Sequence, residues 1–251
     1  MVSKETAKKV AIVTGASAGI GAATARSLAQ AGYEVVVGAR RVDRLEALAQ
    51  EIGGRALPLD VTDAESVSRF VAEIDRVHLL VNNAGAAYGT DRIESALDER
   101  WLQMFELNVL GVLRMIRALL PLLEASGDGH VINLGSIAGF ETYIGGAGYT
   151  ASKHALRALT KTLRLELLGK PIRVTDISPG LVETEFSMIR FDGDADRAKQ
   201  PYLGMTPLVA QDIADCVVFA ATRPSHVDID EIVVRPRDQA TATTVFRRTQ
   251  T

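Results

Sequence analysis

The chain has 251 residues, of which 28 are lysine or arginine and 31 are aspartate or glutamate, so its formal net charge is -3. This balance, with both signs spread along the chain, excludes a general attraction for nucleic acid or anionic membranes, and no apolar run reaches the ~20 residues of a membrane span. Cys216 is the only cysteine, so no internal disulfide can form and we expect a cytoplasmic protein.

Short β-rich runs alternate with longer helical patterns from one end of the chain to the other. The predicted strands are Val10–Thr14, Glu34–Gly38, Ala56–Leu59, Leu79–Asn82, His130–Leu134, Arg173–Ile177 and Glu231–Val234. The predicted helices include Ile20–Ala31, Arg44–Ile52, Asp63–Ile74 and Tyr149–Leu168. Such alternation favours a parallel sheet covered on both faces. We therefore predict one α/β domain over residues 1–251, with a seven-stranded parallel sheet.

The segment 185–206 interrupts this alternation and is predicted to be an irregular substrate loop. Long loops in compact domains are usually functional or mobile. Gly193 and Gly204 could act as hinges of a lid. Four apolar side chains could either cover a substrate or contact another subunit: Phe186, Met188, Ile189 and Phe191.

Glycines follow the first predicted strand, at Gly15, Gly19 and Gly21. Gly15 permits a tight turn, Gly19 lets the backbone approach a pyrophosphate, and Gly21 lets the following helix pack closely on the strand. The helix N-terminus then presents free N–H groups to phosphate oxygens. The spacing differs from the common G-x-G-x-x-G, and an ordinary glycine-rich turn is the alternative. The predicted dinucleotide contacts in this turn are Gly15, Ser17, Gly19 and Ile20.

The second predicted strand runs into Ala39, Arg40 and Arg41. A protein that binds NAD would be expected to place an acid here for the ribose hydroxyls, and that acid would repel a 2′-phosphate. Helix N-termini disfavour cations, so an arginine pair at this point indicates a nearby anion, the alternative being two solvated charges. We predict that the cofactor is NADP, with Arg40 the more important of the two arginines.

Two further turns follow the third and fourth strands. Asp60 could bond an adenine amino group, with Val61 covering the ring, or it could cap the helix that begins near Ala64. The stretch Asn82–Gly85 carries two amides and a glycine, which could line the cofactor, join neighbouring strands, or do both. The predicted cofactor contacts here are Asp60, Val61, Asn83, Ala84 and Gly85.

Tyr149 and Lys153 lie four residues apart, on one face of a predicted helix. An ammonium group favours the phenolate, so we expect Lys153 to lower the pKa of Tyr149 from its usual value of about 10. Ser136, after the fifth strand, could hydrogen-bond the same substrate oxygen. Asn108 lies in an apolar helical stretch, where a water-bridged path to Lys153 would satisfy its amide. A lone Tyr–Lys pair is more often a surface pair, but the four residues together predict proton transfer.

At these positions the sequence resembles the short-chain dehydrogenase/reductase family. The resemblance implies a Rossmann-type three-layer sandwich, a homotetramer, and an oxidoreductase that transfers a hydride. The four histidines show no ligand spacing, so we predict no metal site. The matching residues span almost the whole chain: TGASAGIG at 14–21, NNAG at 82–85, Asn108, Ser136, YTASK at 149–153, Pro179–Gly180 and Thr184.

The resemblance also implies a role for each of these residues. Tyr149 would be the general acid in reduction and the base in oxidation, and Lys153 would lower its pKa and hold the nicotinamide ribose. Ser136 would orient the substrate oxygen, and Asn108 would hold the water of a proton relay. The nicotinamide would be lined by Pro179, Gly180, Val182 and Thr184.

The C-terminal third is similar to one subgroup, the bacterial NADP-dependent 3-hydroxy acid (serine/allo-threonine) dehydrogenases. The similarity lies in segments 176–182, 184–187 and 189–194 and in the tail at 224–229. The tail also resembles reductases of clavulanate-type biosynthesis. The subgroup implies substrates such as L-allo-threonine, serine or 3-hydroxypropionate.

A hydroxy acid carries a carboxylate, which the arginine fork binds well, and Arg190 is the candidate. Tyr143 and Ser136 are further candidate substrate contacts. Alternatively, Arg190 pairs with a nearby acid (Asp192, Asp194 or Asp196) or points to solvent. Two other functions stay open: a broad-specificity NADPH-dependent aldehyde/ketone reductase, and a non-catalytic NADP(H)-sensing regulator, against which the complete catalytic set argues. The pair at 247–248 is predicted to be solvated tail.

Overall fold

The computed structural model describes residues 8–248, within which seven strands form one parallel sheet. The order of the strands across the sheet is β3-β2-β1-β4-β5-β6-β7. This confirms the predicted fold class, and the predicted strand ends agree with the observed ones to within two residues. The strands are β1 (Val10–Thr14), β2 (Glu34–Ala39), β3 (Arg55–Pro58), β4 (Leu79–Asn82), β5 (Gly129–Leu134), β6 (Ile172–Pro179) and β7 (Glu231–Val234).

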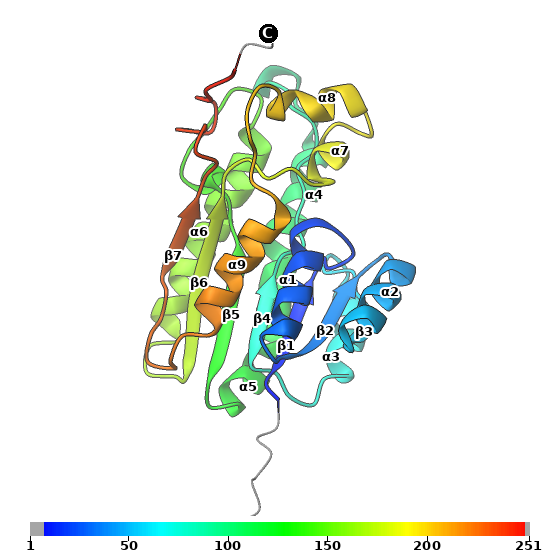
Figure 1. Ribbon diagram of the computed structural model, residues 1–251, viewed down its shortest axis with the longest axis vertical. Coiled ribbons are helices and arrows are strands. Elements are labelled where there is room, and N and C mark those ends of the chain that lie inside the picture. The colour runs from blue at the N-terminus through cyan, green and yellow to red at the C-terminus, as the bar shows by residue number, and fades with distance from the viewer. Residues whose placement is uncertain (1–7, 249–251) are drawn as a thin grey trace, which may run out of the picture.

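Helices cover both faces of the sheet, which gives the three layers (Figure 1). One face carries α1 (Gly19–Gln30), α2 (Val42–Ile52) and α9 (Ala210–Ala221). The other face carries α3 (Ala64–Ala72), α5 (Gly111–Ala125) and α6 (Ala147–Glu166). A further helix, α4 (Asp98–Phe105), continues through the π-helical turn η2 (Glu106–Leu110) into α5. None of the helices within residues 8–248 combines the length and the apolar character that crossing a membrane would require.

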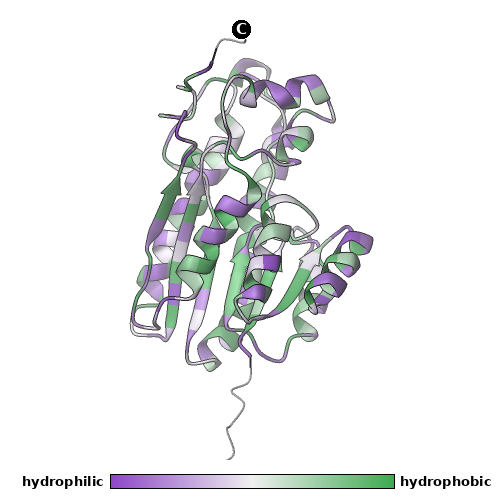
Figure 2. Cartoon of the chain, in the orientation of Figure 1, coloured by the Kyte–Doolittle hydropathy of each residue, from purple (hydrophilic) through white to green (hydrophobic). Residues whose placement is uncertain are grey.

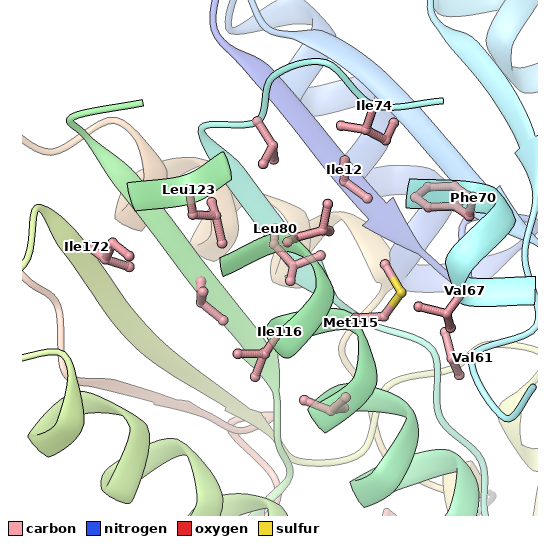
Figure 3. Packing of buried hydrophobic residues seen from close by; sticks show 14 of the residues in the cluster. Ile12, Val61, Val67, Phe70, Ile74, Leu80, Met115, Ile116, Leu123 and Ile172 are labelled. Atoms are coloured by element: carbon pink, nitrogen blue, oxygen red, sulfur yellow. The ribbon is translucent and has the colours of Figure 1, made fainter. Parts of the chain in front are cut away.

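The core consists of one apolar layer on each side of the sheet. On one side, Ile12 and Leu80 of the strands pack with Phe70 and Met115 of the helices (Figure 3). The opposite layer joins the other side of the strands to α1, α2 and α9. Because both faces are covered, the strands are continuously hydrophobic rather than alternating, as Figure 2 shows for the central ones.

The direction in which successive strands join the sheet reverses between β1 and β4. The strands β2 and β3 lie on one side of β1, and β4 to β7 lie on the other side. Turns at the carboxyl ends of neighbouring strands diverge at such a point and leave a crevice, which is where ligands bind in open α/β sheets. The short elements at this end of the sheet are η1 (Ile93–Ser95), η3 (Ile137–Gly139), α7 (Phe186–Arg190), α8 (Ala195–Lys199) and η4 (Gln200–Tyr202).

The segment 185–206, here called the substrate lobe, is not the irregular loop that the sequence predicts, because it contains α7, α8 and η4. The carboxylate of Asp194 caps α8 by accepting hydrogen bonds from two backbone amides of its first turn. Gly193 and Gly204 have φ angles of +87° and +70°, a region that glycine adopts without strain. The lobe lies beyond the carboxyl ends of the strands (Figure 1).

A buried histidine in the sheet is expected to make the folding stability sensitive to acid. His130 of β5 is 1% exposed, and its Nε2 lies 2.8 Å from the hydroxyl of Thr175. Burial, reinforced by the charges of Arg173 and Lys9, lowers its pKa from 6.5 to about 3. Between these pH values the unfolded chain binds a proton that the folded protein does not. Folding stability is therefore lost as the pH falls through this window, by up to about a tenfold change in the folding constant per pH unit.

We expect the urea midpoint of unfolding to fall between pH 6.5 and 5, before most carboxylates titrate. A His130→Gln variant keeps an amide that can hydrogen-bond Thr175, and it should lose this part of the pH dependence. Urea titrations at several pH values measure both. The same slope in wild type and variant would show that His130 is not the responsible group.

Candidate active site

A cavity of about 740 Å³ opens between the sheet and the substrate lobe. Its walls come from the turns that follow β1 to β6, from α6 and α7, and from residues 239–247, here called the C-terminal tail. Asn108 is 1% exposed and lies behind the cavity wall. All the other predicted site residues line the cavity: Gly15, Ser17, Gly19, Ile20, Arg40, Arg41, Asp60, Val61, Asn83, Ala84, Gly85, Ser136, Tyr143, Tyr149, Lys153, Pro179, Gly180, Val182, Thr184 and Arg190.

The turn after β1 forms a cradle that leaves no room for side chains. Gly15 has a φ of +66°, and a Cβ added to it would lie 2.8 Å from the Cα of Ala84. A Cβ on Gly21 would lie 2.5 Å from Nδ2 of Asn83. The backbone at the start of α1 is thus open to the cavity and closed on its other side. This geometry fits the pyrophosphate of a dinucleotide.

The amides of Asn82 and Asn83 join neighbouring parts of the fold. Nδ2 of Asn83 donates to the carbonyl oxygen of Thr14 at 2.9 Å. Nδ2 of Asn82 donates to Oδ1 of Asn133 at 2.9 Å, and Asn133 in turn donates to Thr160 on α6. The structural role considered for this stretch is confirmed, and the cofactor contacts at residues 83–85 stay a prediction.

At the adenosine end, Arg41 contacts two neighbouring side chains. Its Nε donates to the hydroxyl of Ser17 at 3.0 Å, and its guanidinium pairs with Glu185 at 2.8 Å. Arg40 lines the same cavity with an exposed side chain.

Asp60, on the same wall, does not cap α3. The helix begins at Ala64, and the cap is Asp63, which accepts a hydrogen bond from the backbone of Glu65. The carboxylate of Asp60 accepts hydrogen bonds from the backbone and hydroxyl of Thr62, at 3.0 and 2.7 Å. The capping alternative is therefore wrong for Asp60, whose contact with adenine stays a prediction.

At the other end of the cavity, charged and aromatic groups surround the ring of Tyr149. Nζ of Lys153 lies 5.9 Å from the ring centroid and donates to the carbonyl oxygen of Leu134 at 2.7 Å. The ring of Phe186 meets that of Tyr149 edge-on, with 5.6 Å between centroids. The guanidinium carbon of Arg190 also lies 5.9 Å from the Tyr149 centroid.

The electrostatics at Tyr149 differ from the sequence-based expectation. Burial raises the pKa of Tyr149 above its usual value, and Tyr143 adds to the effect, while a hydrogen bond with Ser136 and the charge of Arg190 act in the opposite direction. Burial also lowers the pKa of Lys153 to about 8, against the charge of Asp176. The expected depression of the Tyr149 pKa by Lys153 is therefore wrong in this structure, because removal from water outweighs the favourable charges.

Asn108 lies in the π-helical turn η2, a type of turn that is frequent at functional sites. Its Oδ1 accepts from the backbone of Ala86 at 3.0 Å, and its Nδ2 donates to the carbonyl oxygen of Ala86 and to the hydroxyl of Ser152. The amide therefore does not need the water-bridged path to Lys153 to be satisfied. A Cβ on Gly85 would lie 3.0 Å from Oδ1 of Asn108 and 3.7 Å from Nζ of Lys153, so Asn108 supports the wall beside Lys153.

Arg190 of α7 directs its charge into the cavity. Its guanidinium stacks against Tyr143 and Tyr149, and its Nε donates to the carbonyl oxygen of Gly89. Asp192 instead pairs with Arg100, and Asp194 caps α8. Within residues 8–248 Arg190 forms no ion pair, so the alternative that it pairs with a neighbouring aspartate is wrong. The site therefore contains a cation beside the phenol that has no acidic partner among the described residues.

Comparison with known proteins gives the family. The model of the short chain dehydrogenases matches residues 9–194. The chain belongs to this family. It is 58% identical over 242 residues to an uncharacterized oxidoreductase of Mycobacterium tuberculosis, covering 96% of each chain. It is 38% identical over 251 residues to the NADP-dependent 3-hydroxy acid dehydrogenase of Schizosaccharomyces pombe, covering 96% of this chain and 97% of that one.

Among solved structures, the chain is similar to the closed form of a serine dehydrogenase complexed with NADP+. The TM-score is 0.90 and the identity is 37%, and the match covers 96% of this chain and all of the other. The resemblance noted for the short-chain dehydrogenase family is therefore confirmed over nearly the whole length of the chain.

Sequence reasoning missed one wall of the site, the C-terminal tail. Arg247 and Arg248 are exposed, as predicted, but both also contact the folded chain: the guanidinium of Arg247 donates to the carbonyl oxygens of Pro201 and Leu203, and Arg248 pairs with Asp238. The tail packs on the substrate lobe, and its lack of hydrophobic periodicity gave no signal of this. Tail residues that line the cavity are Gln239, Ala242, Thr243, Val245 and Arg247.

Three of the four apolar side chains that could cover a substrate from segment 185–206 line the cavity. Phe186, Ile189 and Phe191 line the cavity, whereas Met188 does not and is 37% exposed. The described residues, 8–248, bring no three or more His, Cys, Asp or Glu side chains into a group that could hold a metal ion.

Proposed function

We propose that this protein is an NADP(H)-dependent oxidoreductase that interconverts an alcohol and a carbonyl compound by hydride transfer. Its proposed substrates are 3-hydroxy acids such as L-allo-threonine, serine or 3-hydroxypropionate. The observation that carries the substrate class is Arg190, a cation that lies beside Tyr149 without an acidic partner in the described chain. The names of the fission yeast relative and of the serine dehydrogenase support the same class.

The proposed cofactor fits the cavity at both ends. When bound, NADP(H) supplies or accepts the hydride. The glycine cradle at Gly15 and Gly19 would hold its pyrophosphate, and Arg40 and Arg41 would face the 2′-phosphate. At the reacting end, the nicotinamide would be lined by Pro179, Gly180, Val182 and Thr184.

The chain's own part in the reaction is to hold the substrate and move one proton. The hydroxyl of Tyr149 gives a proton to the substrate oxygen in reduction and takes it back in oxidation. Ser136, which lines the cavity together with Tyr149, orients the same oxygen. Lys153, whose Nζ donates to the carbonyl oxygen of Leu134 beside Tyr149, would hold the ribose of the nicotinamide. Phe186 lies against Tyr149 and limits the access of water.

Replacing Arg190 with methionine tests the substrate class. Methionine keeps an apolar contact with Tyr143 and removes the charge, so we expect kcat/KM for 3-hydroxypropionate to fall about 10- to 100-fold, the value of a charge-assisted hydrogen bond. Turnover of a neutral ketone should change little. Arg197→Met is the matched control, because Arg197 stacks on Phe191 in the same lobe but does not line the cavity. Equal losses on both substrates would contradict the carboxylate assignment.

A second candidate is a broad-specificity NADPH-dependent aldehyde/ketone reductase. The apolar side chains of Phe186, Ile189 and Phe191 on the substrate side of the cavity favour it. Steady-state assays with hydroxy acids and neutral ketones distinguish the two, since only the first candidate predicts a preference for anions.

We also propose a homotetramer, the assembly that the family resemblance implies. Apolar side chains that a single chain leaves exposed support self-association through α4 and α5. Leu102 is 68% exposed and Phe105 is 38% exposed on α4 and its junction with η2, and Leu113 of α5 is 38% exposed.

A further inference from the structure

Glu185 links the substrate lobe to the adenosine end of the cavity. It is the residue that precedes α7, and its carboxylate bridges two arginines of the segment that begins α2. Oε2 accepts from Arg41 at 2.8 Å, and Oε1 accepts from Arg44 at 2.9 Å. The partners are 144 and 141 residues apart in the sequence, so the bridge is a tertiary contact between two ends of one cavity.

One arginine of the bridge, Arg41, is a residue proposed above to face the 2′-phosphate of the cofactor. Arg41, Ser17 and Glu185 all line the cavity, next to the glycine cradle. The side chains of Arg41, Arg44 and Glu185 are between 41% and 47% exposed, so solvent and ligands can reach the ion pairs. Hydrogen bonds from the two arginines hold the pKa of Glu185 below its usual value, so this group is an anion at neutral pH.

We propose that Glu185 is an internal counterion that the 2′-phosphate of NADP(H) displaces from Arg41 and Arg44, so that it contributes to cofactor preference and couples the phosphate to the substrate lobe. The inference rests on the proposed function, because it takes Arg41 to face the phosphate. A phosphate monoester carries about -1.5 to -2 charges at neutral pH and three acceptor oxygens, against a single charge on a carboxylate. It therefore outcompetes Glu185 for the same N–H donors.

NAD(H) carries a hydroxyl group at the same position and leaves both ion pairs intact. The phosphate thus changes what holds the start of α7, whereas NAD(H) does not. This helix carries Phe186 against Tyr149, and Arg190 lies at its end. Linkage between two sites is reciprocal. If phosphate binding shifts the equilibrium between two positions of α7 by some factor, the shift between these positions changes the affinity for phosphate by the same factor.

Two adenosine fragments isolate the phosphate in a binding test that needs no substrate. We expect Glu185→Gln to bind 2′,5′-ADP about fivefold more tightly than wild type, the effect of removing exposed ion pairs that compete with the ligand. Binding of 5′-AMP should not change. Glu51→Gln is the matched control, since Glu51 pairs with Arg26 in a surface bridge outside the cavity, and it should bind both fragments like wild type.

Hydrogen exchange tests the link to the substrate lobe. Adding 2′,5′-ADP to wild type should speed exchange of the amides at 186–190, since Glu185 is released, and 5′-AMP should not. In Glu185→Gln these amides should exchange faster from the start and show no response to either fragment. Unchanged or weaker binding of 2′,5′-ADP by the variant, or an equal exchange response in both proteins, would overturn the proposal.

Failure of the proposed function gives a different pattern. A chain that turns over no hydroxy acid leaves both fragment experiments unaffected. A wild type that binds 2′,5′-ADP no more tightly than 5′-AMP would overturn the phosphate site itself, and the role of Glu185 with it. Thermal unfolding of each variant checks that the fold is intact.

Discussion

Replacing Tyr149 with phenylalanine is expected to lower kcat about 10³-fold while NADPH binds as in wild type. The substitution removes the hydroxyl that exchanges a proton with the substrate oxygen. It keeps the ring that meets Phe186 edge-on and lies 5.9 Å from Nζ of Lys153. Steady-state rates on a hydroxy acid and fluorescence titration with NADPH measure the two quantities separately.

The matched control is Tyr33→Phe. Tyr33 lies outside the cavity and donates its hydroxyl to the carbonyl oxygen of Ala221, so its loss should affect stability and leave kcat unchanged. A Tyr149→Phe enzyme with wild-type turnover would show that another group moves the proton. A wild type that binds NADPH but reduces no compound in a wide carbonyl panel would instead favour the NADP(H)-sensing regulator.

The groups that set the proton affinity of Tyr149 come from separate parts of the chain. Ser136 follows β5, Tyr143 precedes α6, and Arg190 lies on α7. The four-residue spacing of Tyr149 and Lys153 is visible in the sequence because a helix repeats every 3.6 residues. The direction of the pKa shift is not visible, since it depends on how completely the folded chain removes the phenol from water.

The difference between local sequence patterns and properties of the folded chain also explains which elements could be predicted. The ends of β1, β4 and β7 agree with the sequence analysis because buried apolar runs are bounded there by turn residues. The helices α7 and α8 have five residues each, too few for a hydrophobic period to repeat. Segment 185–206 therefore looked irregular although it is folded.

Contacts between segments that are distant in the sequence could not be predicted either, because they leave no repeating pattern in either segment. The sequence around Arg41 does not indicate that the carboxylate of Glu185, 144 residues later, accepts a hydrogen bond from its guanidinium. The tail from Gln239 to Arg247 also gave no periodic signal, because it is held by single hydrogen bonds, such as that from the backbone of Leu181 to Gln239, rather than by a packed face. Sequence reasoning thus found the residues of local motifs and missed the walls built by tertiary contact.

Replacing Arg40 and Arg41 together with serine is expected to raise the KM for NADPH by about 100-fold and that for NADH by less than about threefold. Each arginine that faces a phosphate contributes a charge-assisted hydrogen bond, and NADH has no phosphate at this position. The single variants rank the two residues. The sequence favours Arg40, whereas the structure favours Arg41, which Ser17 holds in place within the cavity.

Steady-state kinetics with each cofactor at saturating substrate measure this preference, with Arg26→Ser as the control for loss of a surface arginine from the same face of the sheet. Arg26 pairs with Glu51 and does not line the cavity, so its replacement should leave both KM values unchanged. Equal losses with NADPH and NADH in the double variant would mean that the arginines support the fold around the cradle rather than the phosphate. Because Arg40 and Arg41 lie between β2 and α2, outside the sheet, we expect the loss to be confined to NADPH.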